Sequence, residues 1–163
     1  MTGEMANTHR FPVAFSPMTK DDVGEVQAIE EDSFPSPWPR RAFMEMLRCK
    51  ETRFITAFAD GKVVGYAGIK LGRSAHIVNL AVHRGYRKRR IGSRLLAHLL
   101  EVAARHGGNR VTLEVRPSNA AAQRMYRRFG FVPVSVKKGY YPAENEDAII
   151  MARELAEESK DAS

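Results

Sequence analysis

Cysteine is nearly absent from this 163-residue sequence: Cys49 stands alone, which excludes an intramolecular disulfide framework. The five histidines are scattered, so no Cys/His cluster has the spacing of a zinc site. No apolar run approaches the roughly 20 residues of a membrane-spanning helix, and the polar N-terminus lacks the hydrophobic stretch of a secretory signal. We therefore expect a cytoplasmic protein that has neither a metal centre nor a membrane as partner.

The composition is that of one globular domain. Hydrophobic residues make up 44% of the chain and charged residues 28%. A chain of this length can bury roughly two-thirds of its unfolded surface, but it is too short for two full-size domains. Both ends are polar and show no hydrophobic period. We expect a single domain over residues 11–155, between flexible segments at 1–10 and 156–163.

Positive charge is concentrated in one part of the sequence. The chain carries 26 basic and 19 acidic residues, a net charge of +7. Six of the basic residues stand between His83 and Leu100 with no acid among them: Arg84, Arg87, Lys88, Arg89, Arg90 and Arg94. A local cluster of this kind indicates an anionic partner, which is a nucleic acid, an acidic membrane or a phosphate-bearing small molecule.

Hydrophobic periodicity predicts a mixed α+β fold in which hairpins come first and a strand–helix–strand–helix unit follows. A capping box at Thr19 and Asp22 begins the first helix, and Asp60-Gly61 predicts a hairpin turn. A second turn is expected at the Gly139-Tyr-Tyr-Pro142 segment, between the last two strands. The expected strands are 13–15, 54–59, 63–69, 76–82, 110–115, 131–137 and 147–152, and the later helices are 40–49, 91–106 and 119–129.

The basic run from Arg87 to Ser93 precedes and enters the long helix. Helix N-termini present free N–H groups and a partial positive charge, so they attract anions and disfavour cations. Basic residues here oppose local stability, which a solvated loop can tolerate. A bound pyrophosphate would remove the conflict, and Gly92 would let the backbone approach a phosphate closely.

A second informative segment runs from Leu113 to Phe131. Asn119, Ala122 and Tyr126 share one helical face, on which the small alanines would suit a ligand groove. The alternative is that Asn119 only caps the helix and Tyr126 is a half-buried aromatic residue. Glu114 alternates with apolar neighbours and so faces away from them, as a general base or a solvated carboxylate would.

Together these segments resemble the GNAT superfamily of N-acetyltransferases. The resemblance rests on Asn79-Leu-Ala-Val-His-Arg-Gly-Tyr-Arg87, on Leu113-Glu-Val-Arg-Pro-Ser-Asn-Ala-Ala-Ala122, and on the ending from Gly139-Tyr-Tyr-Pro142 to Met151. It covers about residues 13–155. The Leu-Glu-Val-Arg and Tyr-Tyr-Pro segments are similar to those of the RimI-like members, which acetylate the N-terminal alanine of a ribosomal protein.

The resemblance implies a mixed, mostly antiparallel sheet of about seven strands with splayed central strands, and about four helices. Acetyl-CoA would bind where the fourth and fifth strands part. Glu114 matches the general base of the family and Tyr126 its general acid. The implied coenzyme contacts are the backbone of Leu80, Ala81 and Val82 at the acetyl end, the pyrophosphate loop Arg87, Lys88, Arg89, Arg90, Ile91, Gly92 and Ser93, and Asn119.

An α-amine is the easier acceptor, because it titrates about 2.5 pH units below lysine. The resemblance makes the N-terminus of a protein, in the first place a ribosomal protein, the partner. We expect a monomer or weak dimer that makes no direct contact with nucleic acid. The residues expected to contact it are Glu31 or its neighbour Glu30, Trp38, Tyr140 and Tyr141. The alternatives are a broader N-terminal or a lysine acetyltransferase, and a basic nucleic-acid or ribosome-binding protein with a vestigial acetyl-CoA site.

One position departs from the family pattern. Arg90 stands where GNAT proteins usually have the first glycine of the pyrophosphate loop, and only Gly92 is kept. If the position requires a positive φ, Arg90 costs of order 1 kcal/mol; otherwise its guanidinium could add a phosphate contact. His76 and His83 are weaker rivals to Glu114 as the base, and Cys49 is too far from the cleft segments to carry an acetyl group.

Overall fold

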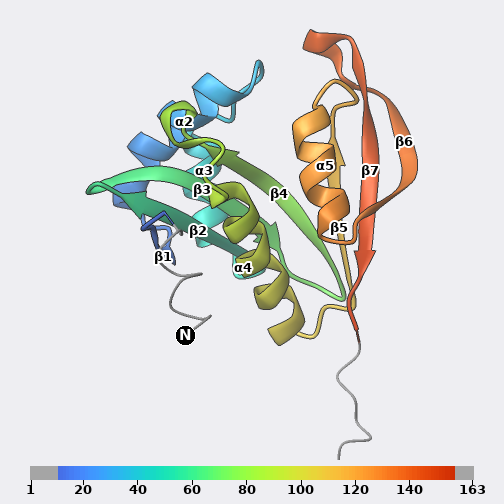
Figure 1. The fold of residues 1–163 in the computed structure, drawn as a ribbon, viewed down its shortest axis with the longest axis horizontal. Helices are drawn as coiled ribbons and strands as arrows, with labels where there is room; N and C mark the ends of the chain where they lie inside the picture. Colours follow the sequence, from blue (N-terminus) through green and yellow to red (C-terminus); the bar gives the residue numbers. More distant parts are fainter. Residues whose placement is uncertain (1–10, 157–163) are drawn as a thin grey trace, which may run out of the picture.

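The structure, a computed structural model, describes residues 11–156 as one seven-stranded sheet with helices on both faces (Figure 1). The expected end segments, 1–10 and most of 156–163, lie outside the described residues. The strands in the described part are β1 (Ala14–Pro17), β2 (Thr52–Ala59), β3 (Lys62–Lys70), β4 (Ser74–Val82), β5 (Arg110–Val115), β6 (Val132–Tyr141) and β7 (Glu146–Glu154). The α-helices there are α2 (Val23–Ser33), α3 (Arg40–Arg48), α4 (Ile91–Arg105) and α5 (Ala120–Arg128).

The strand order is β1-β2-β3-β4-β5-β7-β6, and every neighbouring pair is antiparallel except β4 and β5. The predicted mixed, mostly antiparallel sheet is therefore confirmed. The β2–β3 hairpin turns at Asp60 and Gly61, whose φ values of 53° and 74° are those that a tight hairpin turn requires.

Two hydrophobic clusters, one on each face of the sheet, hold the helices. The cluster beneath α2 and α3 contains Val26, Phe43 and Tyr66, and the cluster beneath α4 contains Val64 and Leu95. Strand β3 contributes to both, so its residues are buried on both faces. None of the helices within residues 11–156 has the length and hydrophobicity of a membrane span.

Short-range signals set where the first helices begin. The backbone N–H of Thr19 donates to the Asp22 carboxylate at 2.8 Å, and this capping box opens a 3-10 turn (Lys20–Asp22) that leads into α2. The proline-rich segment between Ser33 and Arg40 makes no regular element before α3 begins.

The two central strands separate soon after they meet. β4 and β5 are paired only where Ser74–His76 lie beside Arg110–Thr112. Beyond this point β5 stays paired with β7, while β4 stays paired with β3. The sheet therefore opens into a gap between β4 and β5 (Figure 1).

The predicted turn at Gly139-Tyr-Tyr-Pro142 is wrong in its position. Strand β6 continues to Tyr141, and the turn to β7 is made by Pro142–Asn145. The pairing of β6 with β7 shifts register between Lys137 and Tyr141, and Gly139 has a φ of 63° there. Its glycine signal therefore marks a bulge inside the strand rather than the end of the strand.

Candidate active site

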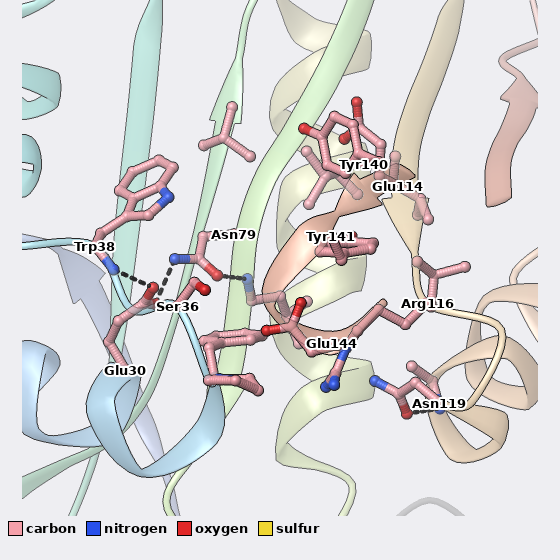
Figure 2. Close-up of a pocket in the computed structure, with 18 of the residues that line it drawn as sticks. Glu30, Ser36, Trp38, Asn79, Glu114, Arg116, Asn119, Tyr140, Tyr141 and Glu144 are labelled. Carbon is pink, nitrogen blue, oxygen red and sulfur yellow. Dashed lines mark hydrogen bonds between the residues drawn. The ribbon is translucent and has the colours of Figure 1, made fainter. Parts of the chain in front are cut away.

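A pocket of about 290 Å³ occupies the gap between β4 and β5. Its walls come from β4, β5, α5, the C-terminal part of α2, the loop before α3 and the end of the β6–β7 hairpin (Figure 2). The structure brings seven of the predicted site residues together on these walls: Trp38, Leu80, Glu114, Asn119, Tyr126, Tyr140 and Tyr141. Residues as far apart in the sequence as Trp38 and Tyr141 therefore meet at the point where the two strands separate.

Glu114 reaches the pocket from β5, on the opposite side of the strand from the buried Leu113 and Val115. One carboxylate oxygen lies 2.7 Å from Nε2 of His76, and the other lies 3.5 Å from Nζ of Lys137. Burial alone would raise the pKa of Glu114, but the hydrogen bond and charge of His76, with a smaller contribution from Lys137, lower it below its usual value. The group is therefore an ionised carboxylate at neutral pH.

His76 is the residue beside Glu114 that sequence reasoning placed only as a rival. Its Nδ1 lies 2.6 Å from the hydroxyl oxygen of Thr112, so both ring nitrogens are engaged. His76 is the last β4 residue paired with β5, and its imidazole is held by two β5 side chains, those of Thr112 and Glu114. The ring therefore fixes the direction of the Glu114 side chain.

Tyr126, on α5, is buried and lines the same pocket. Its hydroxyl makes no hydrogen bond within residues 11–156, and its ring packs edge-on against Phe131. Burial, with a smaller contribution from Tyr141, raises the pKa of Tyr126 to about 12. The phenol therefore keeps its proton at neutral pH and faces the same space as Glu114.

Strand β4 supplies backbone to the other wall. Its pairing with β3 shifts register between Gly68 and Ile69, which leaves Val78 as an extra residue. Just after this bulge, the N–H of Leu80 donates to the side-chain oxygen of Asn79 at 3.0 Å. The Asn79 amide in turn donates to the buried carboxylate of Glu30 at 2.6 Å. Figure 2 shows this chain of bonds across the pocket from Glu114.

The basic loop leads into the N-terminus of α4. Lys88 and Arg90 both have a φ of 63°, and Arg90 is the residue before the helix, without a side-chain bond to its first turn. Arg87 donates to the carbonyl of Val82, and Arg89 lies over the ring of Phe11 at 4.5 Å. Among the residues that the structure describes, the side chains of Lys88 and Arg90 have no hydrogen bond or ion pair.

The comparisons with known proteins agree with this geometry. Residues 23–131, well over half of the chain, match the model of the acetyltransferase (GNAT) family. The chain belongs to the GNAT family. It is therefore an acetyl-CoA-dependent N-acetyltransferase, and the GNAT fold implied by its sequence motifs is confirmed.

This GNAT protein is 36% identical over 155 residues to the N-alpha-acetyltransferase RimI of Mycobacterium tuberculosis, covering 91% of this chain and 96% of that protein. It is 31% identical over 140 residues to the ribosomal protein bS18-alanine N-acetyltransferase of Escherichia coli, covering 84% and 94%. The crystal structure of the ribosomal-protein-S18-alanine N-acetyltransferase from E. coli aligns with a TM-score of 0.84, at 28% identity over 93% of this chain and 99% of that one.

GNAT acetyltransferases use acetyl-CoA, and the groups along this cleft fit that molecule. The first N–H groups of α4 lack intrahelical acceptors, and they are flanked by two cations that have no partner within residues 11–156. Lys88 and Arg90 therefore suit a diphosphate, and the gap between the strands suits an extended pantetheine chain. Asn119 caps α5, because its side-chain oxygen accepts from the N–H of Ala122 at 3.1 Å, and its amide group still lines the pocket.

Several predicted residues of the GNAT site lie outside the pocket. Ala81 faces the cluster beneath α2 and α3, and Val82 ends β4. Glu31 is exposed on α2, whereas its neighbour Glu30 lines the pocket. The remaining members, residues 87–93, form the loop and first turn of α4 rather than the pocket wall. Arg90 is therefore not among the residues that line the pocket.

The other reactive side chains have local roles. The ring of His83 accepts from the N–H of Gly85 at 3.0 Å and so caps a short 3-10 turn. Cys49 follows α3 and contacts the Glu51 carboxylate at 3.0 Å. Neither residue lines the pocket.

Proposed function

We propose that this protein is an N-terminal protein acetyltransferase. It moves the acetyl group of acetyl-CoA directly to the α-amine of a protein that begins with alanine, and the acceptor is a ribosomal protein. The observation that carries the proposal is that the carboxylate of Glu114 and the protonated phenol of Tyr126 face one pocket at the strand gap. The name of the M. tuberculosis relative, an N-alpha-acetyltransferase, supports the α-amine as acceptor. The name of the E. coli relative supports an alanine at the N-terminus of a ribosomal protein.

Glu114 is the general base in this proposal. An ammonium group must lose a proton before its nitrogen can attack, and an ionised carboxylate in the pocket can accept that proton directly or through a water molecule. His76 is the positioning residue, because its hydrogen bond to Glu114 fixes the side chain and favours its charged form. Lys137 acts in the same direction from β6 at 3.5 Å.

Tyr126 is the general acid, and backbone supplies the electrophilic contact. The thiolate that departs from acetyl-CoA needs a proton, and Tyr126 holds one at neutral pH. The N–H of Leu80 is the donor that polarises the thioester carbonyl. Farther along the cleft, the loop from Arg87 to Ser93 holds the diphosphate, and Asn119 contacts the pantetheine chain.

The acceptor enters between the loop before α3 and the end of the β6–β7 hairpin. Trp38 lines the first wall, and Tyr140 and Tyr141 line the second (Figure 2). Glu144, which sequence reasoning missed, adds a carboxylate to the second wall. Its Oε1 is shielded from solvent and has no hydrogen-bond partner within residues 11–156. A carboxylate in this state favours a positively charged acceptor.

A panel of peptides tests the proposal. Peptides that begin with Ala, Ser or Met-Leu, and one with a blocked N-terminus and an internal lysine, are incubated with acetyl-CoA and analysed by mass spectrometry. We expect the peptide that begins with alanine to gain one acetyl group fastest and the blocked peptide to stay unmodified. Acetylation of the blocked peptide alone would make the protein a lysine acetyltransferase and reject the proposal.

A further inference from the structure

A group of hydrogen bonds converges on one buried carboxylate in the wall across the pocket from Glu114. Glu30 on α2 is only 2% exposed. Its oxygens accept hydrogen bonds from the side-chain amide of Asn79 at 2.6 Å, from the backbone N–H of Trp38 at 2.9 Å and from the hydroxyl of Tyr66. One carboxylate therefore connects α2, β3, β4 and the loop on the acceptor side. Figure 2 shows its bonds to Trp38 and Asn79.

Glu30 determines which way the Asn79 amide is turned. A side-chain amide has a donor end and an acceptor end, and a carboxylate only accepts. With its Nδ2 on Glu30, Asn79 points its Oδ1 at the N–H of Leu80, 3.0 Å away. The reversed amide would place oxygen against the carboxylate and NH₂ against the Leu80 N–H. Both contacts would be repulsive, so the orientation is fixed.

The Leu80 N–H points into the gap between the strands. The N–H of His83 bonds to the carbonyl of Val64 on β3 at 2.8 Å. Successive N–H groups of a strand alternate in direction, so the N–H three residues earlier points away from β3. On that side β5 has already left β4. The Asn79 side chain is therefore the acceptor that satisfies the Leu80 N–H within the described residues.

We propose that Asn79 is a positioning residue whose amide oxygen, aimed by Glu30, is a removable cap on the Leu80 N–H. The acyl carbonyl oxygen of acetyl-CoA takes its place on binding. The inference rests on the proposed function in one respect, which is that the Leu80 N–H is the donor to the thioester carbonyl. The cap lets binding exchange one hydrogen bond for another, so the N–H is not left buried without an acceptor.

The exchange predicts a difference between acetyl-CoA and CoA, because only acetyl-CoA carries the carbonyl that displaces the cap. The quantity to measure is the ratio of their affinities by titration calorimetry, which needs no acceptor. In Asn79→Asp, an ionised carboxyl group at position 79 would hold the N–H through a charge-assisted bond of roughly twice the strength. The carbonyl would then compete poorly, and we expect the acetyl-CoA to CoA ratio to fall roughly three- to tenfold.

Protonation of the new carboxyl group would restore the native pattern, since its O–H can donate to Glu30 while its other oxygen accepts from Leu80. The titratable side chains in this cluster are Glu30 and Tyr66, and two carboxyl groups at this distance share a proton, which raises the pKa of the new group. The ratio for Asn79→Asp should therefore be near wild type at low pH and fall as the pH rises from 5.5 to 8.5.

A double variant separates the role of Glu30 from that of position 79. With Glu30→Gln present as well, the amide at position 30 would donate to the new carboxyl group and keep it ionised, so the ratio should be low at every pH. Asn109→Asp is the matched control, because Asn109 is an exposed residue of the α4–β5 connection. Its ratio should equal that of wild type.

The inference is overturned if Asn79→Asp and the double variant both match the wild-type ratio at every pH. A low acetyl-CoA to CoA affinity ratio in the double variant supports the inference, whether or not the ratio of Asn79→Asp changes with pH. Thermal melts of all variants identify any that have failed to fold. Peptide acetylation is measured separately. A protein that shows the change in affinity ratio but acetylates no peptide would contradict the proposed function, whereas the inference about Asn79 would stand.

Discussion

The backbone conformation at Arg90 is strained, and replacing Arg90 with glycine should stabilise the protein. Its φ of 63° and ψ of 17° are left-handed, and it stands directly before the first turn of α4. An L-residue with a side chain pays about 1–2 kcal/mol in this region relative to glycine. A cation at a helix N-terminus is also unfavourable, by about 0.3–1 kcal/mol.

Two contributions to the free energy of unfolding favour Arg90→Gly, and a third opposes it. Relief of the left-handed strain and removal of the cation stabilise the folded state, whereas the greater freedom of glycine in the unfolded chain costs about 0.5–1 kcal/mol. The net gain is roughly 1–2 kcal/mol. For a domain of this size we expect Tm to rise by about 3–6 °C.

Thermal unfolding followed by circular dichroism measures the effect, with two control variants. Arg90→Ala removes the charge but keeps the strained backbone, so its Tm should rise by only about 1–2 °C. Arg89→Gly should lower Tm, because φ at Arg89 is not positive and its stacking on Phe11 is lost. If Arg90→Gly were no more stable than Arg90→Ala, the reasoning from backbone strain would be refuted.

The remaining predictions concern the chemistry of the pocket. Glu114→Gln and Tyr126→Phe should each lower kcat about 10²–10⁴-fold with an unchanged Tm, and near-normal rates in both would reject the assigned roles. His76→Gln removes contacts that lower the pKa of Glu114, so the acid limb of the kcat/KM pH profile should move to higher pH, and an unmoved limb would argue against this coupling. Lys137→Met should move the same limb by less, since the Nζ of Lys137 lies 3.5 Å from the carboxylate. A larger shift than that of His76→Gln would contradict the larger contribution of His76 to the lowered pKa of Glu114.

The architecture could be predicted because its signals are local. The Asp60-Gly61 turn, the capping box at Thr19 and the alternation that turned Glu114 away from Leu113 each depend on a few neighbouring residues. The glycine at position 139 misled for the same reason. Turns and bulges both use a positive φ, and only the pairing of β6 with β7 shows which one is present.

The partners within the site could not be predicted, because they depend on strand register. His76 meets Glu114 only because β4 and β5 pair over three residues and then part. Glu30, rather than the exposed Glu31, lines the pocket because of the rotation of α2 on the sheet. No spacing along the chain shows that a carboxylate at position 30 bonds to an amide at position 79.

The central claim is that the pocket delivers acetyl to an α-amine with Glu114 as the base. The most direct test uses one peptide that begins with alanine and also contains a lysine, and locates the acetyl group by tandem mass spectrometry after reaction with the wild type and with Glu114→Gln. The account predicts acetylation of the α-amine alone by the wild type, and at least about 100-fold less by the variant. Acetyl on the lysine, or equal modification by both proteins, would contradict it.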